Sequence, residues 1–330
     1  MNENLYRLIT DFQAAVETAL KLMCRSGIKM PSSNYEWVKY NIPGVGELEG
    51  GIKYFKHGAG CKIELSSGSL DFDFGELGEV GGFNAWWLTY FAGENLIAYG
   101  FRNYDDVAKH MKQALDDGEL ICPDHDLCYI ANIPYSYAIN IDSRNYQDLL
   151  PIHNRDRVLI LYFHYFETAN LMFKSYNKIN KEIDKGRHLS QKKAFDMRIY
   201  LFTWLGFLGV VCEGFKKLNM RILLQSERPA EFKELLSMSD SIGKLMTEHS
   251  DSLRVFRNNI FHLRQDADFL HDFFARDVGR LTWAQELHKS LSCFFSQYRC
   301  CCEVHYVFNG RKGESDLIKN KINRRKKAAL

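Results

Sequence analysis

The hydrophobic and polar positions of residues 1–150 follow one long helical pattern and several short alternating ones. Between residues 5 and 25, apolar residues recur three and four positions apart, which predicts an amphipathic helix. Apolar and polar residues then alternate over 51–55, 61–65 and 69–74, as in half-buried strands. A second helix is predicted near 105–117. We therefore expect an α+β domain over residues 1–150.

The second half carries a longer helical periodicity. Apolar residues keep helical spacing over 156–183, 190–218, 228–248, 252–275 and 278–308. Ser190 is a suitable N-cap, and Asn219 and Gly279 are suitable boundary residues. Long amphipathic helices with short connections predict an all-α up-and-down helical bundle over residues 151–310.

The formal net charge of +2 hides two halves of opposite sign. Residues 1–150 carry 12 basic and 21 acidic side chains, whereas 151–330 carry 31 basic and 20 acidic ones. Eight basic and two acidic residues fall in 311–330, which we expect to be a flexible basic tail. The excess of positive charge in the second half favours a polyanionic partner.

Composition narrows the class of protein. With 330 residues, 46% of them hydrophobic and 25% charged, the chain resembles a globular protein rather than a disordered or fibrous one. The most apolar stretch, 200–212, is shorter than the roughly 20 residues of a membrane helix, and no secretory signal opens the sequence. We expect a cytoplasmic protein without membrane association, whose nine cysteines are reduced thiols.

One short segment of the second half carries residues suited to a reaction. Arg257, Asn258 and His262 lie within six positions, and on a helix Asn258 and His262 would share a face. The apolar side of that helix would consist of Val255, Phe256, Ile260 and Phe261. Histidine exchanges protons near neutral pH, and arginine binds phosphoryl oxygens as negative charge builds. This set suits metal-free RNA cleavage, in which the 2′-hydroxyl attacks the neighbouring phosphate.

The Arg257-Asn258-x-x-x-His262 motif, late in a helical bundle with one more long helix behind it, resembles the HEPN superfamily (higher eukaryotes and prokaryotes nucleotide-binding). Ribonucleases of that family carry an Arg, often followed by a polar residue, then four to six residues and a His. The segment 208–217, which contains Glu213, is similar to the preceding helix in many bacterial members. The resemblance covers roughly 151–310 and implies a metal-independent endoribonuclease on an up-and-down bundle.

The resemblance also implies roles and partners. His262 would be the general acid/base, Arg257 the phosphate ligand, Asn258 the orienting group and Glu213 a supporting residue. A homodimer would bring two Arg/His pairs into one cleft. The family acts in toxin–antitoxin and antiviral systems, so a cognate antitoxin or a phage-derived trigger is an expected partner besides RNA. No cofactor is expected.

Alternatives stay open for this region. Arg/His pairs of suitable spacing also occur at Arg157 and His164, Arg264 and His271, and Arg299 and His305. Glu213 would equally suit a buried structural ion pair. The bundle could also be a non-catalytic HEPN-like scaffold that binds RNA or protein, with the N-terminal domain as its sensor.

The acidic half has a candidate site of its own. Four carboxylates lie around four glycines, next to two tryptophans: Asp71, Asp73, Glu76, Glu79, Trp86 and Trp87. Hard cations prefer several oxygen ligands, so a metal-dependent enzyme or a ligand sensor is one interpretation. We favour a strand that ends in Gly-rich turns before an aromatic core helix. The segment also resembles an uncharacterised bacterial domain, which implies no activity.

Other motifs are less informative. Cys122, His125 and Cys128 offer three zinc ligands without a fourth, and we favour an exposed loop. The consecutive cysteines 300–302 point in different directions on a helix, so core packing explains them better than a metal site with His305. No GxGxxG, Walker A, GxSxG or HExxH motif occurs, which argues against dinucleotide, nucleoside triphosphate, serine-hydrolase and zincin functions.

Overall fold

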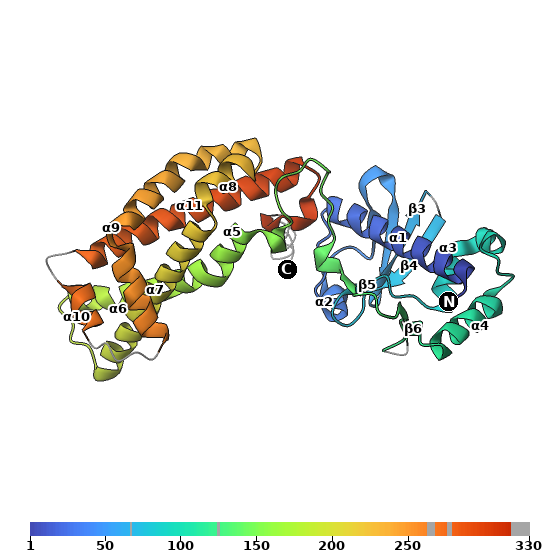
Figure 1. Ribbon diagram of the computed structural model, residues 1–330, viewed down its shortest axis with the longest axis horizontal. Coiled ribbons are helices and arrows are strands. Elements are labelled where there is room, and N and C mark those ends of the chain that lie inside the picture. Colours follow the sequence, from blue (N-terminus) through green and yellow to red (C-terminus); the bar gives the residue numbers. More distant parts are fainter. Residues whose placement is uncertain (67, 124–125, 263–267, 276–278, 318–330) are drawn as a thin grey trace. The chain divides into compact units, whose positions relative to one another are not determined.

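The computed structural model describes residues 1–66, 68–123, 126–262, 268–275 and 279–317, which form two compact units (Figure 1). The first unit comprises Met1–Tyr146 and the segment that begins at His305. The second comprises Gln147–Val304. The first has helices and antiparallel sheets, and the second is mostly helical, so the α+β character of the first half and the helical character of the second are confirmed.

The first unit is built on helix α1 (Glu3–Arg25), which matches the predicted amphipathic helix. The Asn2 side chain caps it by accepting hydrogen bonds from the backbone amides of Asn4 and Leu5. Its buried face carries residues three and four positions apart: Leu5, Leu8, Ile9, Phe12, Val16, Ala19, Leu20 and Met23. The other helices of this unit are α2 (Asn34–Lys39), α3 (Ala85–Ala92) and α4 (Tyr104–Asp116).

Four antiparallel strands form the main sheet in the order β1-β2-β3-β4. They are β1 (Val45–Glu47), β2 (Lys53–His57), β3 (Gly60–Leu65) and β4 (Gly68–Asp73), and the last three confirm the predicted strands. In their register, Ile63 lies between Tyr54 and Leu70. These three side chains are buried on one face, and α1 and α3 pack against β4.

Two smaller sheets and several short 3-10 turns complete the first unit. Strand β5 (Glu79–Val80) pairs with β8 (Ser136–Tyr137), and β6 (Leu120–Ile121) pairs with β7 (Tyr129–Ile130). The 3-10 turns are η1 (Glu49–Gly51), η2 (Gly93–Tyr99), η3 (Ala138–Asn140) and η8 (Lys312–Glu314).

The cysteine prediction is wrong for two residues, because Cys122 and Cys128 form a disulfide. The pairing of β6 with β7, together with a bridge between Phe83 and Cys128, brings the two Cα atoms to 4.2 Å across a six-residue separation. The seven other cysteines are free thiols. Burial raises the pKa of the Cys61 and Cys212 thiols to about 12, so both stay protonated at neutral pH.

The predicted basic tail differs from the structure over its first residues. Arg311 is fully buried in the first unit, where its guanidinium donates two hydrogen bonds of 2.7 Å to the Glu314 carboxylate and stacks on Tyr306. The turn η8 then packs against α1. A count of charges could not predict the burial of Arg311, because that burial depends on the packing of η8 against α1 and on the ion pair with Glu314. Residues 318–330 lie outside the described residues.

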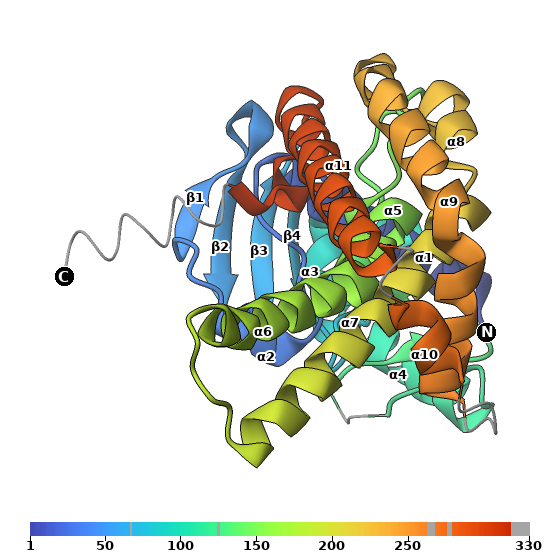
Figure 2. The same ribbon diagram turned by 90° about the vertical axis from the view of Figure 1, so that its left-hand side faces the viewer.

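The second unit is a succession of helices, in which α6 and α7 form a hairpin (Figure 2). Its elements are η4 (His153–Arg155), α5 (Arg157–Ile160), the π-helix η5 (Leu161–Phe166), α6 (Glu167–Asp184), α7 (Gln191–Lys217), α8 (Met220–Ser226), η6 (Ala230–Leu235), α9 (Leu236–Phe261), α10 (Phe269–Phe274) and α11 (Arg280–Phe308), of which the last four residues belong to the first unit.

Most helix boundaries follow the sequence signals, and the expected helix over 252–275 does not. Ser190 caps α7 by accepting a 3.3 Å hydrogen bond from the Lys193 amide, as predicted. Asn219 and Gly279 directly precede α8 and α11, also as predicted. The expected break between residues 248 and 252 corresponds to a kink at His249, whose backbone is non-helical (φ −136°, ψ 19°). The helix expected over 252–275 instead ends at Phe261, and α10 begins at Phe269.

A buried network of hydrogen bonds connects three parts of the second unit. The Asp156 carboxylate accepts hydrogen bonds from Arg228 (2.9 Å) and from the Tyr298 hydroxyl (2.6 Å), and Arg228 also donates to Tyr298 (2.6 Å). Asp156 further caps α5 through the amide of Val158. All three members of the triad are buried. They join the start of α5, the connection after α8, and α11.

Helix α7 is apolar enough and long enough to cross a membrane by length and composition. Eight of its residues are buried inside the second unit, where it packs against α6 and α9: Trp204, Leu205, Gly206, Leu208, Gly209, Val211, Cys212 and Phe215. A core helix meets the same criterion. The expected cytoplasmic location stays a prediction.

Candidate functional site

The close approach of α7 and α9 positions Arg257. At Gly209 of α7, an added Cβ would lie 3.2 Å from the Arg257 Cβ, and at Gly206 it would lie 2.8 Å from the Phe261 ring. The absence of two side chains therefore lets the end of α9 lie against α7. One helical turn beyond Gly209 on α7 is Glu213, whose carboxylate reaches Arg257 across this contact.

Arg257 is held by two acceptors. Its Nη1 donates to Glu213 Oε2, while Nε and Nη2 donate to the Asn258 amide oxygen at 3.1 and 2.7 Å. The other Glu213 oxygen binds Lys217 Nζ at 2.9 Å. The Arg257 side chain is 18% exposed and that of Glu213 is 40% exposed, so this pair stays open to solvent. The structure therefore brings together three predicted site residues: Arg257, Asn258 and Glu213.

His262 does not lie on the helix, so the expectation that it shares a helical face with Asn258 is wrong. Helix α9 ends at Phe261, and His262 has extended backbone angles (φ −126°, ψ 136°). Its amide donates a 3.1 Å hydrogen bond to the Asn258 carbonyl, which closes the last turn. The His262 side chain is exposed beside the Arg257–Asn258 pair in sequence, and residues 263–267 after it lie outside the described residues.

The apolar residues beside the Arg257–His262 motif differ in burial. Phe256 is fully buried among the aromatic rings of Phe273 and Phe274, while Phe261 packs edge-on against Phe207 at 5.3 Å and is 42% exposed. Val255 is exposed and Ile260 is half-buried. The buried ring anchors α9, and the motif itself lies at the margin of the core.

The alternative Arg/His pairs have structural surroundings. Arg157 pairs with Glu227 at the surface. Arg299 donates to the Tyr162 hydroxyl at 2.9 Å and stacks on its ring, and His305 is buried. His164 lies in the π-helix and His271 on α10. Arg264 lies outside the described residues.

The four carboxylates of the first unit are divided between two places. Asp71 lies 2.7 Å from His57 Nε2, and Asp73 Oδ1 lies 3.8 Å from the other ring nitrogen. Burial raises the pKa of the Asp73 carboxyl. Glu79, on β5, accepts from the Leu77 amide (2.8 Å), and Glu76 is exposed. His57 escaped sequence reasoning because the hairpin register, not the spacing, places it there.

Among the described residues, no group of three His, Cys, Asp or Glu side chains is gathered to hold a metal ion. In the aromatic segment that follows, Trp87 is buried and Trp86 is half-exposed and stacked on Tyr90. The Gly-rich turns followed by a partly buried aromatic helix are what the favoured interpretation predicted.

Among the described residues, the two cysteine segments also form no group of metal ligands. Cys122 and Cys128 are joined in a disulfide and offer no thiolate ligand, and His125 lies outside the described residues. Along α11, Cys300 is exposed, Cys301 is half-buried and Cys302 is buried. The three thiols thus point in different directions, as expected.

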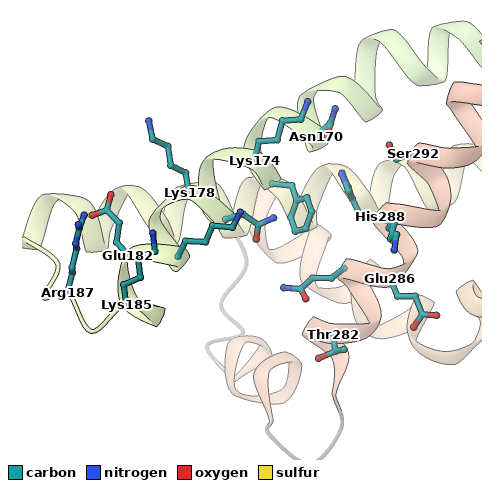
Figure 3. Close-up of a pocket in the computed structure, with 15 residues that line it drawn as sticks. Asn170, Lys174, Lys178, Glu182, Lys185, Arg187, Thr282, Glu286, His288 and Ser292 are labelled. Carbon is teal, nitrogen blue, oxygen red and sulfur yellow. The ribbon is translucent and has the colours of Figure 1, made fainter.

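Sequence reasoning missed a groove of about 1060 Å³ between α6 and α11. Figure 3 shows Lys174, Lys178 and Glu182 on α6, Lys185 at its C-cap, and Thr282, Glu286, His288 and Ser292 on α11. Six cationic residues line the groove: Lys174, Lys178, Lys181, Lys185, Arg187 and Lys289. Four of these lysines recur every three or four residues between 174 and 185, a signal already present in the sequence.

His288 forms part of the groove wall and is buried. Its Nδ1 accepts a 3.2 Å hydrogen bond from the Trp204 indole, which places the proton of the neutral ring on Nε2. Burial, with a smaller contribution from Lys174, lowers the pKa of His288 to about 4. The ring is therefore neutral near pH 7 and adds no charge to the groove.

Comparison with known proteins bears on the first unit. Residues 5–130 are similar to a domain of unknown function (DUF6896). The matched stretch, fewer than half of the residues, runs from α1 through the main sheet and α4 to β7. No curated protein and no solved structure matches the chain. The description of that domain names no activity.

Proposed function

We propose that this protein is a metal-independent endoribonuclease of the HEPN type, acting through the second unit. The observation that carries the proposal is the placement of Arg257, which Glu213 and Asn258 hold at the α7–α9 contact while it stays partly exposed. His262 follows directly after the end of the same helix and is exposed. A fixed cation and, five residues later, an accessible histidine suit phosphoryl transfer.

In the proposed reaction, a 2′-oxygen of RNA attacks the adjacent phosphorus as its proton leaves. The bond from phosphorus to the 5′-oxygen breaks, and that oxygen takes up a proton. The products are a 2′,3′-cyclic phosphate and a 5′-hydroxyl. His262 transfers a proton, Arg257 neutralises charge on the phosphoryl oxygens, and Asn258 and Glu213 orient the guanidinium.

One histidine cannot serve as base and acid in the same step, so we propose a homodimer that supplies two. The proposed biological role is that of a toxin or an antiviral effector, with a cognate antitoxin or a phage-derived trigger as its regulator. Light scattering after size exclusion tests the dimer directly, and a strict monomer would contradict it.

RNA cleavage in EDTA tests the activity. We expect His262→Ala and Arg257→Ala each to lower the cleavage rate at least about hundredfold, which is the usual contribution of such groups. The matched controls are His271→Ala, which tests another Arg/His pair, and Arg254→Ala, which removes an exposed arginine from the same helix. Full cleavage by both site variants would refute the assignment.

A second candidate is a non-catalytic scaffold that binds RNA or protein. It is favoured by one observation, that Nε and both terminal nitrogens of Arg257 already have acceptors within the chain. RNA binding without cleavage by any version, across RNAs of varied sequence, would establish it instead.

A further inference from the structure

The positive charge of the helical unit is concentrated on the α6–α7 hairpin. Residues 174–198 carry eight basic and three acidic side chains. The other residues of 151–310 carry fifteen of each sign. The surplus over 151–310 therefore belongs to this hairpin, and the rest of that range, including the Arg257 site, is balanced.

The hairpin presents these charges as a row. Lys174, Lys178 and Lys181 lie on one side of α6 and Lys185 at its C-cap, about one turn apart, over roughly 16 Å. Opposite them, α11 contributes a polar row: Thr282, Gln285, Glu286, Lys289 and Ser292. All four lysines are exposed.

The two carboxylates of the groove do not cancel this row. Glu182 is bound by Lys193 Nζ of α7 at 2.7 Å, so its charge is already matched from outside the groove lining. Glu286 lies on the opposite helix, next to Lys289 in the polar row. Six cations face two carboxylates in the lining as a whole.

This lining selects the class of ligand. Pockets for small molecules are lined predominantly by hydrophobic and aromatic residues, whereas every residue that lines this groove except Phe173 is charged or polar. A line of cations suits an extended polyanion, because each phosphate of a strand meets the next charge along the helix.

We propose that the α6–α11 groove binds the sugar–phosphate backbone of single-stranded RNA. The choice of RNA rests on the proposed function, while the choice of an extended polyanion rests on the groove itself. The lysine row holds the phosphates, and the hydroxyl and amide groups of α11 contact the sugar side of the strand.

The test measures binding of a fluorescently labelled single-stranded RNA by anisotropy, in EDTA, with every protein carrying His262→Ala. The groove variant is Lys178→Gln with Lys181→Gln. The matched control is Lys233→Gln with Lys244→Gln, which removes two exposed lysines outside the groove. Circular dichroism confirms that all proteins are equally folded.

We expect the groove variant to bind the RNA about tenfold more weakly at 150 mM salt. The slope of the log association constant against log salt concentration should become less steep by about 1.4, because two phosphate contacts are lost. The control should stay within twofold. Equal losses in both variants, or no binding by the parent protein, would overturn the proposal. Since no cleavage is needed, this outcome is separate from whether the wild type cuts RNA.

Discussion

Two arginine–carboxylate pairs in the helical unit show how environment separates structure from function. Arg228 and Asp156 are completely enclosed and share Tyr298 as a third partner. Arg257 and Glu213 are partly exposed, and their remaining partners, Asn258 and Lys217, come from the same two helices. The first pair is closed to any ligand, whereas the second is open to solvent and, in the proposed reaction, would exchange an internal partner for a phosphate.

The difference also appears in what each pair costs to break. A buried charge left without its partner keeps its desolvation penalty, whereas an exposed charge regains water. The loss of unfolding free energy on breaking each pair should therefore distinguish the two pairs more clearly than the distances between their charged groups.

The largest effect is expected from the enclosed pair. Asp156→Ala leaves Arg228 buried without its carboxylate and removes the cap of α5, so we expect a loss of about 3–5 kcal/mol in unfolding free energy. Urea unfolding followed by circular dichroism measures it, because the helical unit dominates that signal. A loss below about 1 kcal/mol would remove the distinction between the pairs.

A smaller effect is expected from pH. Because the pKa of His288 is about 4 in the folded protein, below its ordinary value near 6.5, protons bind preferentially to the unfolded chain between these values. Stability should fall by about 2 kcal/mol from pH 7 to pH 5 and stop falling on this account below pH 4. In His288→Phe the same titration should lose this component, and an unchanged pH dependence would contradict the assignment.

Replacing the partly exposed Arg257 should cost less stability still. For Arg257→Ala we expect a loss of about 1–2 kcal/mol in urea unfolding, since solvent reaches its pair with Glu213 and neither partner is left fully buried. The cleavage rate should nevertheless fall as proposed above. A stability loss comparable to that of Asp156→Ala would show that Arg257 is a structural residue.

The smallest effect is expected from Glu213→Gln, which keeps an acceptor for Arg257 but removes the charge. If Glu213 positions the guanidinium, kcat should fall several-fold while KM stays nearly constant. Glu248→Gln, an exposed glutamate on α9, is the matched control. A change confined to KM would contradict a positioning role.

Local patterns predicted much of this fold. Helix α1, three strands of the main sheet and the boundaries at Ser190, Asn219 and Gly279 follow from periodicity and capping, because each depends on neighbours in sequence. The helical half was predicted for the same reason. Glu213 and Arg257, which the family resemblance placed in one site, do meet, although 44 residues separate them.

Long-range arrangements escaped prediction. The Asp156–Arg228–Tyr298 triad joins residues 70 to 142 positions apart, and no pattern in sequence marks them. The Cys122–Cys128 disulfide depends on a strand pairing, and the departure of His262 from the helix depends on where α9 ends. The lysine row can be seen in the sequence, but the groove could not be predicted from it, because the opposite wall is formed by α11, about 100 residues later in the chain.

Gly206 and Gly209 give the site a property that its charged residues do not reveal. An added Cβ would lie 3.2 Å from the Arg257 Cβ at Gly209 and 2.8 Å from the Phe261 ring at Gly206, so α9 or its side chains would have to shift to admit one. A single methyl group at Gly209 would act as a wedge and change how far Glu213 stands from Arg257. The distance between Glu213 and Arg257 thus depends on two glycines that carry no functional group. A substitution at either glycine would change that distance while leaving every polar residue of the site in place.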